Sequence, residues 1–271
     1  MKPNYLAGAG LLCVAVLAMS AQPSTPRLAD GKPDLNGTWE NGGGIDFLRP
    51  QTKADGSVCV TGCAPAAPAA PTGAAAPARP AAAPLPPDRP RYRPEFDARV
   101  ADLKRRQQKE DGVLRCQPPG VPRIGPPDKI VQTAREVVFL YEDVSGPFFR
   151  IVPLREGVKR ADDSESYLGD ATGHWEGDTL VVVSRNFNEL TWLTDDGAFH
   201  SGKLVVTERL TRRGDEIEYR AIADDPAVLA EPWQIRPRRM VRTDVEMAEP
   251  APCVEQDLSN MVDDTYHSNP R

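Results

Sequence analysis

The sequence lacks the short motifs by which many enzyme classes are recognised. It contains no Gly-x-Ser-x-Gly nucleophile elbow, no His-Glu-x-x-His zinc pair and no glycine-rich phosphate loop after a strand. Histidine is scarce, with 3 residues in a chain of 271, so few side chains titrate near neutral pH. We therefore expect no nucleotide or metal cofactor, and any chemistry must come from isolated residues.

Basic stretches are also lacking, and the sequence has a single long apolar run. The net charge is −6, and no stripe of Lys and Arg is interleaved with aromatic residues, which argues against nucleic acid as a partner. The single long apolar run, Leu6 to Met19, follows one lysine and precedes small residues around Ser20 and Ala21. This layout is typical of a secretory signal peptide over residues 1–21, with a retained membrane anchor as the alternative. We expect a periplasmic or secreted mature chain without a membrane span.

Four cysteines lie outside this predicted signal peptide: Cys59, Cys63, Cys116 and Cys253. An even number in an oxidising compartment favours two disulfides, and the sequence leaves three connectivities open. We favour a local Cys59–Cys63 staple and a long-range Cys116–Cys253 clasp. A zinc site built from all four is the alternative, although Cys116 and Cys253 lack paired neighbours.

Composition divides the remaining chain into three parts. Residues 22–63 hold a first strand and a loop, and residues 64–93 are dominated by alanine and proline. Proline fixes φ and removes a donor, and alanine buries little surface, so residues 64–93 should form a disordered tether. A proline-motif ligand is the other interpretation. Residues 94–271 should form the main domain, packed with residues 34–48.

Short β-branched and aromatic runs begin at Lys129, and turn sequences such as SGP, EGD, DDG and RGD separate them. This spacing predicts an antiparallel sandwich or barrel. Ile217, Tyr219 and Ala221 alternate with charged residues, which indicates one dry and one wet face. No strand alternates with a long helix, so a parallel α/β sheet is disfavoured.

One helix is expected at the surface of this domain. The segment 94–112 starts with proline, has acidic residues in its first turn and basic residues later, and ends at glycine. Its apolar stripe consists of Phe96, Val100 and Leu103.

The stretch GHWEGDTLVV contains the first candidate for chemistry. Alternation along a strand places His174 and Glu176 on one face and Trp175 on the other. A carboxylate can orient an imidazole or raise its pKa, so this pair suits acid–base catalysis. The competing interpretation is that both face solvent beside a hairpin turn.

His200 is the second candidate, because it closes a loop that begins with Trp192. A histidine at a barrel mouth beside an indole can bind or protonate a flat ligand. A packed histidine is the alternative, and a metal held by both histidines with Glu176 or Asp170 is another.

Glu208 shares a strand face with the apolar residues Leu204 and Val206, so it should point inward. A buried carboxylate must be paired or hydrogen-bonded, and Arg150 is the candidate partner. The pair is either an internal structural ion pair or part of a ligand site.

Several stretches, among them GKPDLNGTWE and YLGDATGHWEGDTLVVVSRNFNELTWL, resemble an uncharacterised family of exported bacterial β-rich proteins. The resemblance implies bacterial origin and a periplasmic location, and it carries over no catalytic residue. An insertion at residues 57–90 departs from the shorter connection of the family. Gly37 and Trp39 also resemble the Gly-x-Trp opening of lipocalins. Together with the strand and helix patterns, this resemblance leads us to expect an all-β, antiparallel, lipocalin- or calycin-like barrel or half-barrel with one or two peripheral helices.

The resulting hypothesis is an exported protein that binds a small cyclic or apolar molecule in a β-barrel cavity. It would transform this molecule by lyase, isomerase or hydrolase chemistry. His200 and His174 would transfer protons, Glu176 would orient one of them, and Tyr167 or Trp192 would line the site. The alternatives are a non-catalytic periplasmic carrier or envelope-binding module, and a structural envelope protein.

Overall fold

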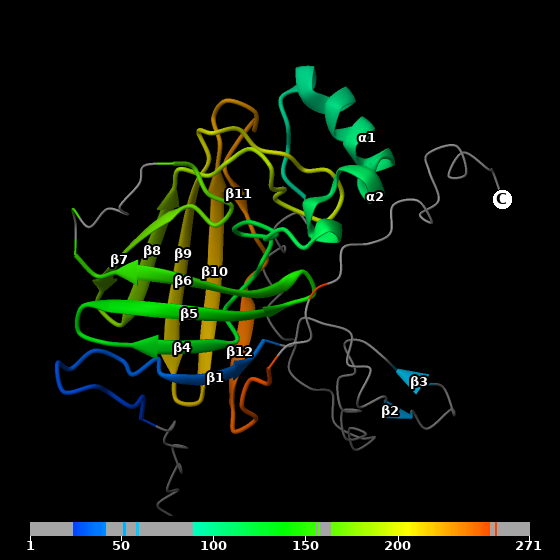
Figure 1. Cartoon of the computed structure of the whole chain (residues 1–271). Helices are drawn as coiled ribbons and strands as arrows, with labels where there is room; N and C mark the ends of the chain where they lie inside the picture. The colour runs from blue at the N-terminus through cyan, green and yellow to red at the C-terminus, as the bar shows by residue number, and fades with distance from the viewer. Residues whose placement is uncertain are drawn as a thin grey trace, which may run out of the picture.

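The protein is a β-rich domain with short helices at one end of its sheet (Figure 1). The computed structural model describes residues 24–41, 51–52, 58–59, 89–155, 157, 164–249 and 253. The helical elements are η1 (Pro94–Phe96), α1 (Asp97–Arg105), α2 (Gln107–Glu110) and η2 (Gly112–Arg115). The strands are β1 (Gly37–Glu40), β2 (Gln51–Thr52), β3 (Val58–Cys59), β4 (Lys129–Gln132), β5 (Glu136–Asp143), β6 (Gly146–Pro153), β7 (Asp170–Glu176), β8 (Thr179–Arg185), β9 (Val205–Arg213), β10 (Glu216–Asp224), β11 (Trp233–Gln234) and β12 (Arg238–Thr243).

The main sheet is antiparallel and closes almost completely into a barrel. Its strand order is β6-β5-β4-β1-β12-β10-β9-β8-β7, and β11 pairs with β10. β4, β5 and β6 cross in front of β7 to β10, and the two ends of the order, β6 and β7, lie next to each other (Figure 1). The predicted all-β antiparallel barrel with peripheral helices is confirmed. β2 and β3 form a separate two-stranded sheet.

Alternation along the strands fills the barrel with side chains. Leu204 and Val206 are buried, and so are Glu208 and Leu210 of β9, as the sequence pattern predicted. Wholly buried residues of the inner core include Leu35, Trp39, Ile130, Val137, Phe139, Val152, Leu180, Val182, Ile217 and Met240. The Trp39 indole Nε1 donates to Leu35 O at 3.0 Å, which satisfies its one polar group inside this core. The barrel interior is thus mainly a packed core.

A second apolar core lies beneath α1. The predicted stripe of Phe96, Val100 and Leu103 packs on a cluster that contains Phe199 and Trp233, so this prediction is confirmed. The Phe96 and Phe199 ring centroids are 5.7 Å apart, and the Arg99 guanidinium lies 3.8 Å from the Phe199 centroid. These aromatic and cation–π contacts hold the helix on the end of the barrel.

The described end of the predicted tether also packs on the domain. Tyr92 forms a β-bridge with Leu229, and its ring stacks on Phe199 with centroids 5.2 Å apart. Arg93 N donates to Val228 O at 3.0 Å. Tyrosine and arginine can bury apolar surface that alanine cannot, so residues 89–93 belong with the domain that follows them. Residues 64–88, and the predicted signal peptide, lie outside the described residues.

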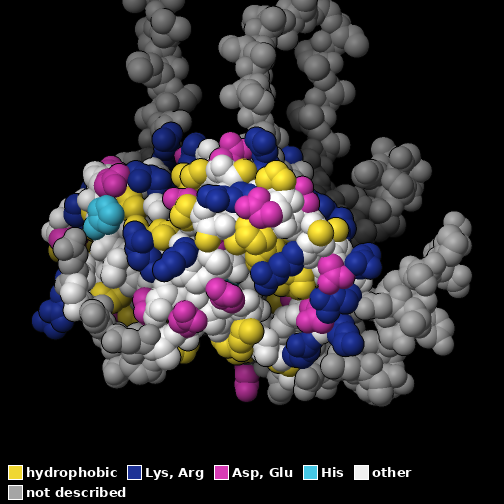
Figure 2. Space-filling model, turned by 90° about the horizontal axis from the view of Figure 1, so that it is seen from above, with side chains coloured by type: hydrophobic (Ala, Val, Ile, Leu, Met, Phe, Trp, Pro, Cys, Tyr) yellow, Lys and Arg dark blue, Asp and Glu magenta, His cyan; other side chains and the backbone are white. Residues whose placement is uncertain are grey.

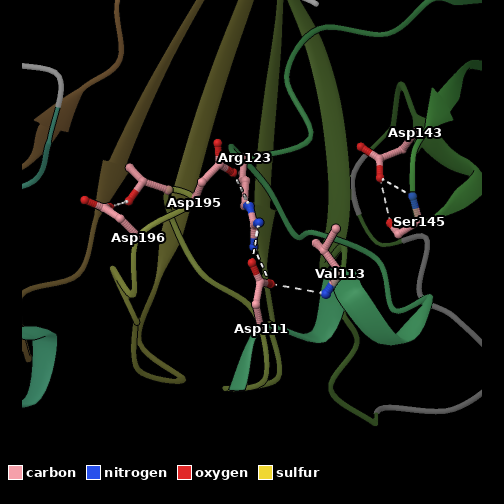
Figure 3. A network of polar contacts seen from close by, with 8 residues as sticks. Asp111, Val113, Arg123, Asp143, Ser145, Asp195 and Asp196 are labelled. Carbon is pink, nitrogen blue, oxygen red and sulfur yellow. Dashed lines mark hydrogen bonds and ion pairs between the residues drawn. The ribbon is translucent and has the colours of Figure 1, made fainter. Parts of the chain in front are cut away.

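Two cross-links fix the segment between the helices and β4. Arg123 donates to both carboxylate oxygens of Asp111 at 2.8 and 2.7 Å, and its Nε donates to Asp195 at 2.8 Å (Figure 3). Cys116 and Cys253 form a disulfide, as predicted. The predicted Cys59–Cys63 staple lies outside the described residues.

The outer surface carries charges of both signs. On the face shown in Figure 2, basic and acidic side chains alternate with apolar ones, and neither sign gathers into one patch. Exposed pairs such as Arg220–Glu218, at 2.6 Å, bridge neighbouring positions on one strand. Within the described part of the chain, no helix has the length and hydrophobicity needed to cross a membrane.

Candidate functional site: a cavity at the seam of the barrel

The hydrogen-bonded sheet ends at β6 and β7, and glycine lets these two strands touch. A Cβ atom at Gly173 would lie 2.8 Å from Val152 Cγ1 and 3.0 Å from Leu154 Cδ2, so only glycine allows this approach. Beside this contact lies a cavity of about 830 Å³, here called the seam cavity. A volume of this size suits a small-molecule ligand.

The exposed lining of the seam cavity is mainly apolar, and it also includes the charged residues Arg150, Asp170 and Arg185. The lining residues are Pro118, Phe149, Arg150, Ile151 and Pro153, residues 166–172, and Val183, Arg185 and Asn186. Phe149 and Ile151 are 64% and 49% exposed, so large apolar surfaces face the cavity and the solvent beside it. Apolar walls with a small number of polar groups are typical of ligand sites.

A buried polar cluster lies behind this cavity, inside the barrel. Arg150 Nη1 and Nη2 donate to the two carboxylate oxygens of Glu208 at 3.0 and 2.6 Å. The same guanidinium donates to Tyr141 Oη at 3.1 Å and to Ser184 Oγ at 2.7 Å. Tyr219 Oη donates to Glu208 Oε1 at 3.0 Å. The predicted pairing of Glu208 with Arg150 is therefore present in the structure. We call these five residues the inner polar cluster.

Burial and charge set the ionisation of this cluster. Burial opposes the charge on Arg150, but the Glu208 carboxylate outweighs it and raises the pKa of Arg150 above its ordinary value. Burial, with the nearby Glu208 charge, raises the pKa of Tyr219 well above its ordinary range, so its hydroxyl stays protonated and donates. The cluster is built around the Arg150–Glu208 ion pair, which is held in an apolar interior.

One donor of Arg150 remains unused. Nε of Arg150 is buried and has no hydrogen-bond partner among the described residues. An unsatisfied buried donor costs about 1–3 kcal/mol, and more when it belongs to a charged group. Arg150 also lines the seam cavity, but its Nε atom is shielded from solvent and does not face the open space.

His174 and Glu176 lie on the outer face of β7, away from the seam cavity lining. His174 Nε2 is 3.3 Å from Glu176 Oε1, and both side chains are about half exposed. Arg209 Nη2 lies 2.6 Å from Glu176 Oε2. The hydrogen bond from Arg209, followed by that from His174, lowers the pKa of Glu176. The predicted pairing of His174 with Glu176 is present, and it lies with Arg209 in an exposed row of charged side chains.

His200 is almost completely buried beneath the second core, with 1% of its surface exposed. Its Nδ1 is 3.0 Å from Ser201 O, which only accepts, so Nδ1 carries the proton. Nε2 then accepts from Thr191 Oγ1 at 2.7 Å. Burial lowers the pKa of His200, which keeps the ring neutral at physiological pH. Trp192 is buried nearby in the second core.

The two histidines do not share an opening, contrary to our expectation. His174 is the Cα partner of Val181 in β8, whereas the His200 ring packs on Phe187, with centroids 6.0 Å apart. Val181 and Phe187 are separated by six positions, roughly 20 Å of extended chain. Neither histidine lines the seam cavity, and Trp192 does not line it either. Tyr167 and Arg150 are lining residues. No group of three or more potential metal-ligating side chains occurs among the described residues.

Sequence reasoning did not single out Phe149 and Ile151 as site residues. The signal was present in PFFRIVP, where Phe149 and Ile151 alternate with Arg150. A strand whose polar residue points inward and whose apolar residues point outward inverts the usual pattern of a half-exposed sheet. This inversion leaves two large apolar side chains exposed on the outer face.

No family model, curated protein or solved structure matches this chain.

Proposed function

We propose that this protein binds a small, mainly apolar molecule in the seam cavity and acts as a carrier or binding module. The observation that carries this proposal is the apolar-walled cavity of about 830 Å³, which the exposed side chains of Phe149 and Ile151 line. The preferred ligand has a hydrophobic body that contacts Phe149 and Ile151. Tyr167 supplies a further ring and hydroxyl at the cavity wall.

The positions of the histidines favour binding over acid–base catalysis. His174 is exposed on the outer face, and His200 is buried in hydrogen bonds to Thr191 and Ser201. A general base must reach the proton that it removes, within about 3 Å or through one water. Neither imidazole lines the cavity that would hold the substrate. A periplasmic location remains part of the proposal, and the Cys116–Cys253 disulfide supports an oxidising compartment.

A cavity-filling variant tests this proposal with a matched control. Thr172 and His174 are both exposed on the outer face of β7, but only Thr172 lines the seam cavity. We expect Thr172→Trp to weaken binding of the neutral apolar probe N-phenyl-1-naphthylamine by about tenfold, or ~1.4 kcal/mol. His174→Trp should leave probe affinity unchanged.

Fluorescence titration with the probe measures both variants, and native mass spectrometry of the purified protein searches for a co-purified ligand. Equal loss of affinity in the two variants would place the probe elsewhere and contradict the proposal. An absence of probe binding by the unmodified protein would also contradict it.

A further inference from the structure

Four polar residues of the seam cavity lining lie close together. Arg185 ends β8, and its Cα partner on β7 is Asp170. Asn186 follows Arg185, and its backbone O accepts from Ser166 N at 3.1 Å. All four residues line the seam cavity. We call Ser166, Asp170, Arg185 and Asn186 the polar wall.

Arg185 is the member of the polar wall whose positive charge is not neutralised by a direct contact. Its side chain is exposed, and within the described ranges no hydrogen bond or ion pair joins this side chain to another residue. Asp170 differs, because its Oδ2 accepts from Asn186 Nδ2 at 2.9 Å. The Arg150 guanidinium, which also belongs to the cavity lining, is paired with Glu208 at 2.6 Å. The N–H donors of Arg185 can therefore serve an anion that enters the cavity.

Apolar surface accompanies the polar wall. Phe149 and Ile151 line the same cavity and are 64% and 49% exposed, and Leu168 of the lining lies between Ser166 and Asp170 in the sequence. Hydrogen bonds between a guanidinium and an anion are about twice as strong as those between neutral groups. Water screens such a contact less beside apolar side chains than on an open surface. The combination suits a molecule with an apolar body and one anionic group.

Asp170 is the group of the polar wall that opposes an anion, so a cation is the competing ligand class. Asp170 is partly buried and already accepts from Asn186, whereas Arg185 is exposed and would repel a cation. A carboxylate that already accepts a hydrogen bond gains less from a ligand than a guanidinium that makes none. The contacts of the polar wall therefore favour the anion.

We propose that the ligand of the seam cavity is an amphipathic anion, such as a fatty carboxylate, whose charged group binds Arg185 while its apolar body contacts Phe149 and Ile151. This inference rests on the proposed function, because it names the ligand class of the same cavity. Arg185 then determines the preference for a charged ligand, and the apolar side chains supply contacts that neutral and anionic ligands share.

Two fluorescent probes with the same ring system separate charge from apolar contact. N-phenyl-1-naphthylamine is neutral, and 8-anilinonaphthalene-1-sulfonate adds one anionic sulfonate to the same rings. We expect Arg185→Gln in the full chain to weaken sulfonate binding about tenfold, through the loss of one hydrogen bond to a charged group, and to leave the affinity for the neutral probe unchanged. Arg185→Lys keeps the positive charge and should lose less sulfonate affinity. Fluorescence titration measures both affinities in each variant.

Arg155→Gln is the matched control. Arg155 is also exposed but does not line the seam cavity, so this variant removes the same net charge without removing the proposed contact. Its affinity for the sulfonate probe should equal that of the unmodified protein. Thr172→Trp fills the cavity and should weaken both probes, which would place them at one site.

The outcomes distinguish this inference from the proposed function. If the unmodified protein binds neither probe, the proposed function itself fails. If the protein binds the neutral probe, but Arg185→Gln leaves sulfonate binding unchanged or weakens both probes equally, the cavity remains a ligand site and the anion assignment is overturned. An equal loss of sulfonate binding in Arg155→Gln would also overturn it, because net charge alone would explain the effect.

A cationic probe tests the competing ligand class. If Arg185→Gln leaves sulfonate binding unchanged and Asp170→Asn abolishes binding of the cationic dye auramine O, the polar wall binds a cation and the proposal is overturned. Auramine O binding that Asp170→Asn does not change, together with loss of sulfonate binding in Arg185→Gln, would support the anion.

Discussion

The residue that most constrains the barrel interior is Glu208. It is completely buried, and its two oxygens accept from Arg150 while one also accepts from Tyr219. A buried ion pair contributes little net stability compared with an apolar pair of similar volume, but removal of one partner leaves a buried charge without compensation. The effect of a mutation here therefore depends on whether one or both charges are removed.

Glu208→Gln should lower the free energy of unfolding by about 3–5 kcal/mol, because Arg150 then keeps an uncompensated charge. Replacement of both residues, Arg150→Met with Glu208→Leu, should cost less than the single change. Urea unfolding followed by circular dichroism measures both. Glu176→Gln, in the exposed pair with Arg209, is the control and should change stability little. A double variant less stable than Glu208→Gln would show that the apolar pair does not fit the site.

Asp128 gives the fold a pH dependence. Burial, followed by the effects of neighbouring groups, raises the pKa of Asp128 to about 6, against the opposing hydrogen bond from Glu142 N at 2.7 Å. The folded state therefore prefers the protonated form. Its contribution to stability is complete below about pH 4, where the unfolded chain is also protonated, and is lost as pH rises through 6. With allowance for solvent at this half-buried carboxyl, the loss is about 1–2 kcal/mol.

Asp128→Asn should remove this loss, because asparagine keeps the acceptor oxygen without the charge. At pH 8 the free energy of unfolding of the variant should exceed that of the parent protein by about 1–2 kcal/mol, and at pH 4 the two should be equal. Urea unfolding at both pH values measures the difference. Asp178→Asn is the control. The hydrogen bond from Arg27 lowers the pKa of Asp178, so the stability effect of this variant should change with pH in the opposite direction. A difference between Asp128→Asn and the parent that is the same at both pH values would contradict the assignment.

At the scale of elements, the sequence predicted the strands of the second half well, because their alternation and turns are local signals. The hairpins at Gly177 and Gly214 lie where the EGD and RGD turns placed them. Which strand packs beside each edge strand depends on residues far apart in the sequence. The contact of β6 with β7 at Gly173 could therefore not be predicted from the sequence. The inward position of Glu208 followed from alternation, whereas the separation of the histidines depended on strand order and loop packing.

At the scale of the whole molecule, the Cys116–Cys253 disulfide encloses every strand from β4 to β12, across a sequence separation of 137. It links the segment before β4 to the segment after β12 and leaves only β1 of the main sheet outside the closed loop. A cross-link over so long a loop removes much of the freedom of the unfolded chain, by about 4–5 kcal/mol at most in the chain-entropy model.

Replacement of both cysteines, Cys116→Ala with Cys253→Ala, should lower the free energy of unfolding by about 2–5 kcal/mol, with the native strand pairing retained. Guanidinium unfolding gives the free energy, and circular dichroism before denaturation checks the strand content. After reduction of both proteins, the parent and the variant should show the same midpoint, since both then lack the same cross-links. An unchanged midpoint in the variant would mean that the contacts of Glu246 and Ala248 already hold the two segments together without the disulfide.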